Sequence, residues 1–285
     1  MQKKLAFMGL FVLLILAACD GKTPIDSVPG TVSVNITVTQ TSSPVPSATA
    51  SRTPAPTATK TASSTPTPDP MIVQGNAFAL PILEKIATRQ PDWEDDFSNP
   101  YRGWSAGQLP SQGPGWGGGE AGYLDDAYFV LTLPETHQQI ESSFGSRFAN
   151  MVFEIDTRFA DESGGAYEIH FRHQKPPRMG YIVLIDDRGR LSITKYISGD
   201  VPSMLMEVNP PSLLRGTATN HIQIVAVRSE IAVFANGELA AYVIDPDYER
   251  DSGAGQINIV TANFGSSNQT TFFDNLKLWI LPNHP

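Results

Sequence analysis

The stretch MVFEIDTRF, residues 151–159, decides the fold class, because its apolar residues recur at every second position. Phe153 and Ile155 fall on one face of an extended chain, and Glu154 and Asp156 fall on the other. Such a period of two is typical of a β-strand with one buried and one polar side. The sequence therefore predicts a half-buried strand here.

The same alternation continues to the end of the chain. It recurs in residues 166–173, 180–187, 190–197, 221–245, 255–264 and 270–281. Asp186-Asp187-Arg188-Gly189 and Asn236-Gly237 divide neighbouring runs and are typical of tight turns. We therefore expect ten to twelve strands in an all-β, antiparallel β-sandwich over residues 92–285, with one core and polar outer faces.

The chain begins with Lys3 and Lys4, an apolar run over 5–16, and Leu16-Ala17-Ala18-Cys19, which holds its only cysteine. This order is typical of a secretory signal. The segment resembles the lipobox of bacterial lipoproteins. The resemblance implies that residues 1–18 are a signal peptide and that Cys19 carries lipid, such as palmitate. It also implies an extracytoplasmic protein attached to a bacterial cell membrane.

Two other interpretations of this segment remain. It could be a plain signal peptide with a coincidental cysteine, or a retained membrane helix. The apolar run is shorter than the about 20 residues that a membrane span needs. With Cys19 assigned to lipid, the chain has no thiol left for a disulfide.

Residues 19–70 have the composition of a disordered tether. In residues 39–70, 22 of 32 positions are Ser, Thr or Pro. Such a segment buries too little apolar surface to fold. Residues 71–91 then predict a short helix, because the apolar residues of 76–89 lie at roughly helical spacing.

The formal net charge is −9, and residues 71–285 alone carry −11. Phosphate backbones are bound by clustered Lys and Arg. The acidic balance therefore argues against a nucleic-acid partner.

Several landmarks of residues 92–281 resemble one known fold family. They are Asp95-Asp96-Phe97, Gly103-Trp104, Gly122-Tyr123, Val233 to Leu239, and Phe272-Phe273-Asp274-Asn275-Leu276. The resemblance is to the concanavalin A-like lectin/glucanase jelly roll, close to laminin G-like modules and 3-keto-disaccharide hydrolase domains. It implies two curved sheets with carbohydrate held on the concave face.

Retaining glucanases of this class carry Glu-x-Asp-x-x-Glu on one strand, which brings two carboxylates together for acid and nucleophile roles. The nearest match is Glu154-Ile155-Asp156-Thr157-Arg158-Phe159. The second glutamate is missing, and Arg158 takes the next place on that face. The segment therefore argues for a solvated face rather than a catalytic pair, and no required cofactor is expected.

Glu168, His170 and Arg172 form a second polar stripe. If the two strands pair, one polar surface would result, formed by Glu154, Asp156, Arg158, Glu168, His170 and Arg172. That surface could bind a sugar or could be an ordinary wet face. On a regular strand, His170 and His173 would point to opposite faces, so the sequence predicts no histidine pair for a metal.

Two tryptophans lie in the glycine-rich region before the first long strand. Trp104 is expected in the core. Trp116, in the loop 113–119, is the better ligand candidate because exposed aromatic rings stack on sugars.

The family resemblance also implies a structural calcium ion between the opening and closing strands, where Asp95, Asp96 and Asp274 stand. Calcium takes six to eight oxygen ligands. The alternative is that Asp96 and Asp274 cap turns.

The leading hypothesis is a lipid-anchored, extracytoplasmic binding module, non-catalytic, for polysaccharide or cell-wall glycan. The alternatives are a glycoside hydrolase-like enzyme using Glu154, Asp156 or Glu168, and a structural or protein-interaction module of the cell envelope.

Overall fold

The computed structural model describes residues 69–141, 147–162, 164–174, 179–197, 201–248 and 253–282. The signal peptide, Cys19 and nearly all of the tether lie outside these residues. The described part belongs to one compact unit, Ser63–Pro285. It consists of one helix followed by seventeen strands in two sheets.

Sheet A has nine strands. Its order is β15 (Glu238–Ile244), β14 (Glu230–Ala235), β13 (Asn220–Val227), β8 (Met151–Phe159), β17 (Gln269–Ile280), β6 (Ala127–Thr132), β5 (Glu120–Leu124) and β2 (Gly107–Gln108), and β1 (Trp93–Asp95) also pairs with β17.

Sheet B has eight strands. Its order is β12 (Ser203–Val208), β11 (Leu191–Ile197), β10 (Met179–Asp186), β9 (Gly165–Gln174), β16 (Gln256–Asn263), β7 (His137–Glu141), β4 (Trp116–Gly117) and β3 (Ser111–Gly113). The strand pairs are antiparallel, apart from one parallel contact between β4 and β7.

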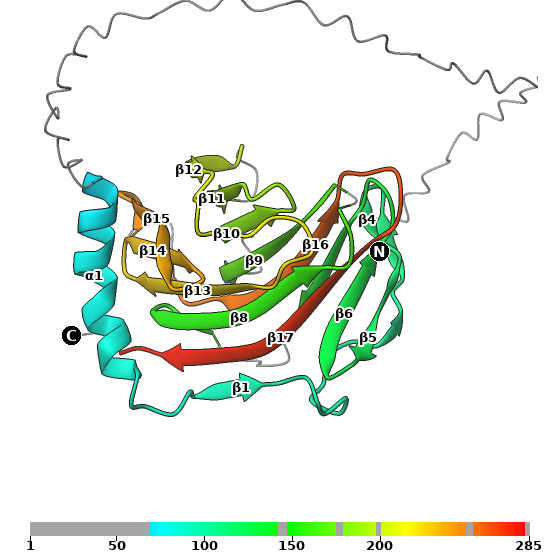
Figure 1. Cartoon of the computed structure of the whole chain (residues 1–285), viewed down its shortest axis with the longest axis horizontal. Coiled ribbons are helices and arrows are strands. Elements are labelled where there is room, and N and C mark those ends of the chain that lie inside the picture. Colours follow the sequence, from blue (N-terminus) through cyan, green and yellow to red (C-terminus); the bar gives the residue numbers. More distant parts are fainter. Residues whose placement is uncertain are drawn as a thin grey trace, which may run out of the picture. The chain divides into compact units, whose positions relative to one another are not determined.

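The two sheets stack face to face and curve in the same sense, with sheet B inside the curve (Figure 1). The main core fills the space between them, with Phe153 and Ile224 from sheet A and Ile169, Phe171 and Tyr181 from sheet B. The predicted antiparallel sandwich is confirmed. The alternation of residues 151–159 is also confirmed, because Phe153 and Ile155 point into this core.

The two predicted turns also form. Asn236 and Gly237 join β14 to β15 with φ angles of 54° and 85°. Positive φ at both positions suits a tight hairpin, and Asn and Gly adopt it most easily. Asp186 organises the β10–β11 turn by accepting hydrogen bonds from the backbone of Arg188 and Arg190.

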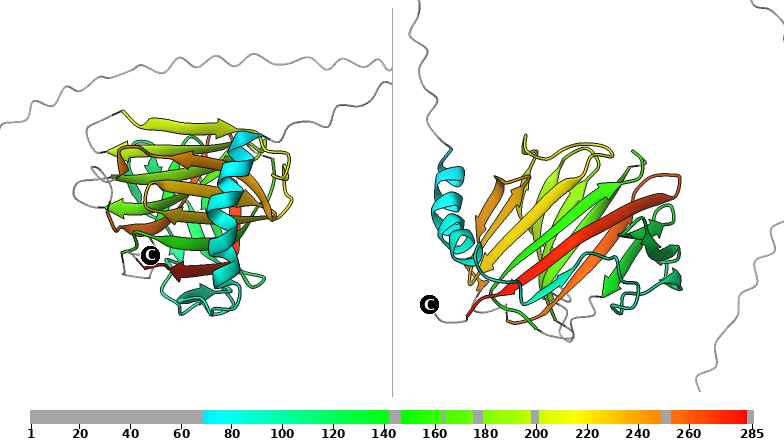
Figure 2. Two further views of the ribbon diagram at one scale, coloured as in Figure 1. Left: turned by 90° about the vertical axis from the view of Figure 1, so that its left-hand side faces the viewer. Right: turned by 60° about the horizontal axis from the view of Figure 1, so that its bottom comes forward.

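Helix α1 (Pro70–Ile86) begins earlier than the spacing predicted and packs on the outer face of sheet A, against β14 and β15 (Figure 2). Asp69 caps it by accepting a hydrogen bond from Met71 N at 2.9 Å. Ala79 and Ile86 enter a second apolar cluster with Phe234 and other sheet A residues. The expectation of a single core with wet outer faces is therefore wrong for this part of sheet A.

Strand number is another difference. The sequence predicts a loop over residues 113–119, but β4 forms within it, and the short strands β2 and β3 precede β4. Their glycines allow very close backbone approach: a Cβ on Gly117 would lie 2.4 Å from Pro110 O. Short segments of this kind carry no alternation, so periodicity does not detect them.

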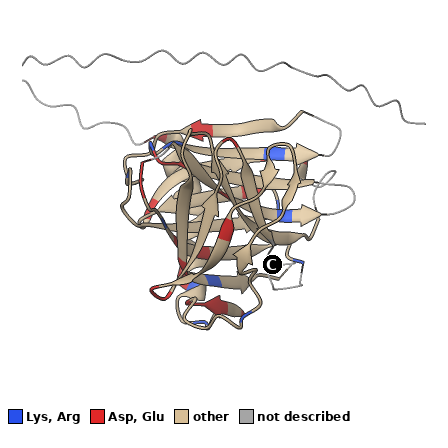
Figure 3. Ribbon diagram, turned by 90° about the vertical axis from the view of Figure 1, so that its right-hand side faces the viewer, with Lys and Arg blue, Asp and Glu red and all other residues tan. Residues whose placement is uncertain are grey.

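Two surface properties bear on partners. Figure 3 views the domain from the right-hand side of Figure 1, and on this side Lys and Arg are scattered singly among Asp and Glu. Within the described residues, α1 is neither long enough nor apolar enough to cross a membrane.

The contact between α1 and β15 depends on Gly75. A Cβ at this position would lie 2.5 Å from a Leu239 methyl carbon and 2.8 Å from Tyr242 Cβ. We expect Gly75→Val to lower the free energy of unfolding by about 1–3 kcal/mol through overpacking, although valine favours helix more than glycine does. Urea unfolding measures this. The exposed neighbour change Gln74→Val is the matched control and should stay within about 0.5 kcal/mol; equal losses in both would contradict the packing argument.

Candidate functional site

Sheet B has one face toward the main core and one face toward the inside of the curve, which we call its inner face. This inner face carries a group of polar and aromatic side chains that contact one another. We call it the inner-face cluster; its members are Trp116, His137, Glu168, His170, His173, Tyr196 and Phe264. Their neighbours Tyr167, Ile169 and Phe171 point the other way, into the main core. Strand β9 is therefore buried on both faces over most of its length.

A β-bulge in β9 determines which side chains join the cluster. Arg172 has φ 52°, and the pairing with β10 and with β16 shifts register beside it. The extra residue returns His173 to the side of His170, with ring centroids 6.2 Å apart. The expectation that these two histidines face opposite sides is wrong, because it assumed a regular strand.

Glu168 is the carboxylate at the centre of this cluster. Its Oε2 lies 2.6 Å from His170 Nε2, and its Oε1 lies 3.6 Å from His137 Nδ1. Burial alone would raise the pKa of Glu168, but the contacts with His137 and His170 outweigh burial and lower the pKa to about 2. Glu168 is therefore an anion at neutral pH and cannot serve as a proton donor there.

An aromatic row continues from this carboxylate toward one side of the face. The rings of Trp116 and His137 are 5.0 Å apart, and those of His137 and Phe264 are 5.7 Å apart. Trp116 is 39% exposed and Phe264 is 55% exposed. Accessible rings next to a fixed anion provide both the apolar and the polar contacts that a small ligand needs.

Buried polar atoms without protein partners lie beside the carboxylate. They are His170 Nδ1 and both amide atoms of Asn258, which stands opposite His170 on β16. Buried polar atoms are nearly always hydrogen-bonded to protein or water. These atoms therefore mark a position where water or a ligand group would complete the hydrogen bonding.

The predicted residues of β8 lie elsewhere. Strands β8 and β9 belong to different sheets, so the single polar surface expected from their pairing does not exist. Glu154 and Asp156 face outward from sheet A, where Asp156 lies 2.7 Å from His221 Nδ1. Arg158 lies there too, 3.8 Å above the Phe272 ring.

His221 and Asp156 form an ordinary ion pair on that outer face. Burial tends to raise the pKa of Asp156, but hydrogen bonds from His221 and Asn275 lower it overall. The bond to Asp156 raises the pKa of His221. Glu154 also has a protein partner, because it accepts a hydrogen bond from Gln223 Nε2. Both carboxylates lie on the outer face of sheet A, whereas Glu168 lies on sheet B.

Arg172 is also displaced from the predicted stripe. The bulge turns Arg172 toward the space between the two sheets, where it is 1% exposed. Its Nε donates to Ala149 O at 2.6 Å, and its guanidinium lies 4.5 Å from the centroid of the Tyr248 ring. Arg172 is therefore a structural residue that holds the chain before β8.

The residues predicted for calcium have structural partners. Asp95 is buried and accepts hydrogen bonds from Phe97 N at 3.0 Å and from Trp104 Nε1 at 2.9 Å, which also confirms Trp104 as a core residue. Asp96 accepts from Ser98 N in the bend that follows it, and Asp274 accepts from Asn275 N at an irregularity within β17. Among the described residues, no group of three or more His, Cys, Asp or Glu is placed to hold a metal. Calcium stays a prediction without geometric support.

Sequence reasoning identified Trp116, Glu168 and His170 but missed four cluster members and the neighbouring Asn258. The four are His137, His173, Tyr196 and Phe264. One available signal was the spacing Glu168-x-His170-x-x-His173, which has the same intervals as Glu-x-Asp-x-x-Glu. Histidines replace the second and third acidic positions. Strand β8 carries only the first two acidic positions of that spacing, whereas β9 carries ionisable residues at all three.

Comparison with known proteins identifies the fold. No protein-family model matches the chain, and no curated protein matches it. The chain is similar to a Bacillus licheniformis beta-glucanase, with 13% identity, a TM-score of 0.52, and coverage of 68% of this chain and 100% of that one. It is also similar to a Bacillus subtilis protein of unknown function with a galectin-like fold, with 8% identity, a TM-score of 0.50, and coverage of 67% and 96%.

A third solved structure is the carbohydrate-binding module CBM66 from Bacillus subtilis. It shares 16% identity at a TM-score of 0.46, over 61% of this chain and 97% of that one. The described sandwich is a concanavalin A-like jelly roll, as its landmarks predicted. At these identities the likeness concerns the fold alone.

The lowered pKa of Glu168 predicts a specific acid response. A carboxylate whose folded pKa lies below its unfolded value of about 4.3 stabilises the protein above that pH, and the stabilisation is lost as pH falls toward 2. The difference in unfolding free energy between the unsubstituted protein and Glu168→Gln should therefore shrink between about pH 5 and about pH 2.5, because this range runs from above the unfolded pKa almost down to the folded pKa. Urea unfolding at several pH values measures it. The exposed Glu238→Gln should show no such trend; a constant difference for Glu168→Gln would refute the assignment.

Proposed function

We propose that this protein is a carbohydrate-binding module that holds polysaccharide or cell-wall glycan on the inner face of sheet B, without cleaving it. The observation that carries the proposal is the arrangement of Glu168 between two imidazoles, next to the exposed rings of Trp116 and Phe264. Sugars present both apolar ring faces and hydroxyl groups. Aromatic rings bind the first, and carboxylate and imidazole groups hydrogen-bond the second.

The similarity of fold supports the same class of ligand. The Bacillus licheniformis protein with this fold is a beta-glucanase, and therefore acts on a carbohydrate. We extend to this chain only the binding of carbohydrate.

The chemistry of the cluster argues for binding over hydrolysis. Hydrolysis by a pair of carboxylates needs one that is protonated and donates to the leaving group. Among the residues of the inner-face cluster, Glu168 alone has a carboxylate, and its pKa is lowered to about 2. Glu168 takes the first position of the Glu-x-Asp-x-x-Glu spacing, and His170 and His173 take the two later acidic positions.

Attachment to the membrane is a second part of the proposal. It rests on the lipobox-like Leu16-Ala17-Ala18-Cys19 and the Ser/Thr/Pro-rich residues that follow. Acylation of Cys19 with more than one chain would give stable anchoring, since a single acyl chain binds membranes only marginally. The module would then display its inner face to glycans outside the cytoplasm.

Glycan binding is tested on a glycan array that includes β-glucans and peptidoglycan fragments, followed by titration of the best ligand. We expect Trp116→Ala and His170→Ala each to weaken binding about tenfold or more, equivalent to about 1.4 kcal/mol. Tyr101→Ala is the matched control, because Tyr101 is an aromatic residue that is 92% exposed outside the cluster. It should bind as the unsubstituted protein does.

Two results would overturn this part of the proposal. The first is an array without any ligand, which would favour a structural or protein-interaction role. The second is release of reducing sugar that is lost in Glu168→Gln, which would identify a glycoside hydrolase-like enzyme.

The lipid anchor is tested by feeding cells that express the full chain an alkyne-labelled fatty acid. Cys19→Ser should abolish labelling and move the protein out of the membrane fraction, because the thiol is the attachment point. The neighbouring Asp20→Ser keeps the thiol and should retain the label. Unchanged labelling of Cys19→Ser would refute the anchor without affecting the glycan result.

A further inference from the structure

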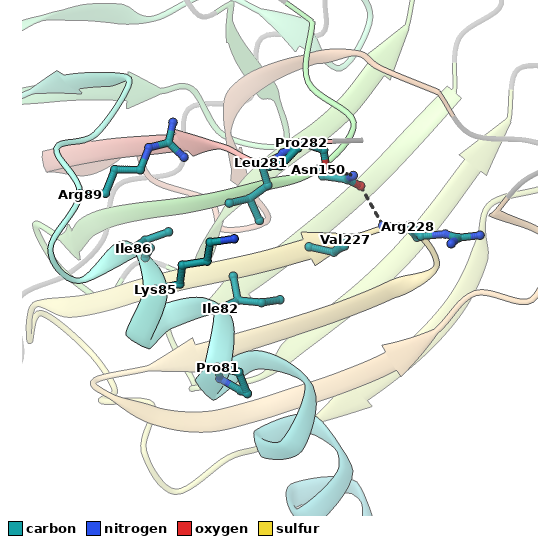
Figure 4. Close-up of a pocket in the computed structure, with 10 residues that line it drawn as sticks. All are labelled: Pro81, Ile82, Lys85, Ile86, Arg89, Asn150, Val227, Arg228, Leu281 and Pro282. Atoms are coloured by element: carbon teal, nitrogen blue, oxygen red, sulfur yellow. Dashed lines mark hydrogen bonds between the residues drawn. The ribbon is translucent and has the colours of Figure 1, made fainter. Parts of the chain in front are cut away.

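A pocket of about 350 Å³ lies on the outer face of sheet A, away from the inner-face cluster. It is bounded by the second half of α1 and by the ends of two strands of sheet A (Figure 4). Ile82 and Ile86 of α1 form one wall, and Val227 and Leu281 form the other. Its size falls in the range of small-molecule sites, which are mostly apolar with a few polar groups.

The charges of this pocket are unusual for this chain. Its lining includes Lys85, Arg89 and Arg228 but no Asp or Glu, although the whole chain carries −9. Arg89 already has a partner, since it donates to Asp92 Oδ1 at 2.6 Å and to Ile280 O at 3.0 Å. The pocket therefore combines apolar walls with positive charge.

Lys85 is the cation that faces the pocket. Figure 4 shows its ammonium group reaching past Ile82 toward Val227, whereas the Arg228 guanidinium points away. Within the described residues, Lys85 has no ion-pair partner. An ammonium beside apolar walls suits a ligand with an apolar chain and one anionic end.

The volume limits the length of that chain. At about 30 Å³ for each water-sized group, the pocket accommodates about a dozen non-hydrogen atoms. Decanoate has this number. A single ammonium matches a single carboxylate, and the apolar walls disfavour highly charged ligands such as polyphosphates, whose desolvation would be costly.

We propose that this pocket binds a free, medium-chain alkyl carboxylate, with its carboxylate at Lys85 and its chain between α1 and sheet A. The site is independent of the glycan site, because the two lie on opposite faces of the sandwich.

The test is isothermal titration of the protein with decanoate below its micelle concentration. We expect saturable one-to-one binding with a Kd below about 1 mM. Shortening the chain by one methylene should weaken binding about fourfold, which corresponds to about 0.8 kcal/mol for one buried CH₂. Decanol and decyltrimethylammonium, which lack the anion, should bind about tenfold more weakly or worse.

Variants then separate the head from the tail. Lys85→Met keeps an unbranched apolar side chain but removes the charge, so it should weaken decanoate about tenfold and leave decanol unchanged. Ile82→Trp fills the pocket and should abolish binding of both. Lys277→Met, a lysine of β17 outside the pocket, is the matched control and should bind decanoate normally. Lys85 is exposed, so its replacement leaves the fold intact, which thermal unfolding checks.

Absence of saturable decanoate binding would overturn the proposal. Equal weakening by Lys85→Met and Lys277→Met would also overturn it, because attraction would then come from general surface charge. Neither result would affect the glycan proposal, whose variants lie on sheet B.

Discussion

The bulge at Arg172 is the constraint on which the arrangement of the inner face depends. One extra residue in β9 sends Arg172 between the sheets and returns His173 to the side of Glu168 and His170. The backbone around the bulge is so crowded that only glycine fits beside it. A Cβ on Gly255 would lie 2.2 Å from Arg172 C, and one on Gly180 would lie 2.9 Å from Phe171 O. The two glycines on the neighbouring segments and the bulge therefore belong to one structural feature.

That feature explains how a strand can be buried on both faces and still carry ionisable groups. Below the strand, the arginine is stabilised by a backbone carbonyl and by aromatic rings. Above it, the carboxylate of Glu168 is stabilised by imidazoles. A buried charge without such partners would be strongly destabilising. The two charges of β9 therefore have different surroundings: Glu168 contacts two imidazoles, whereas Arg172 donates through Nε and lies beside aromatic rings.

Sequence periodicity predicted what depends on neighbouring residues: the long strands, the Asn236-Gly237 hairpin and the inward side of β8. It did not predict which strands share a sheet, because pairing between residues far apart is decided by the whole core. Glu154 and Glu168 follow the same alternation, yet one lies outside sheet A and the other inside the curve of sheet B. His137 comes from β7 and Phe264 from the residue after β16, and no local pattern marks either. The sequence marks the bulge only through Gly180 and Gly255, which lie on segments next to β9. Those glycines become informative only once the strand pairing is known.

The position of α1 also has a mechanical consequence. The helix begins at Pro70, is capped by Asp69 and is held by a second apolar cluster that is distinct from the main core. A pull on the chain at Asp69 therefore loads this small interface first. Its contacts with β14 and β15 form a cluster separate from the one between the sheets, so α1 joins the jelly roll through an interface of its own. A force on the chain at Asp69 would therefore act on the α1 interface before it acts on the packing between the two sheets.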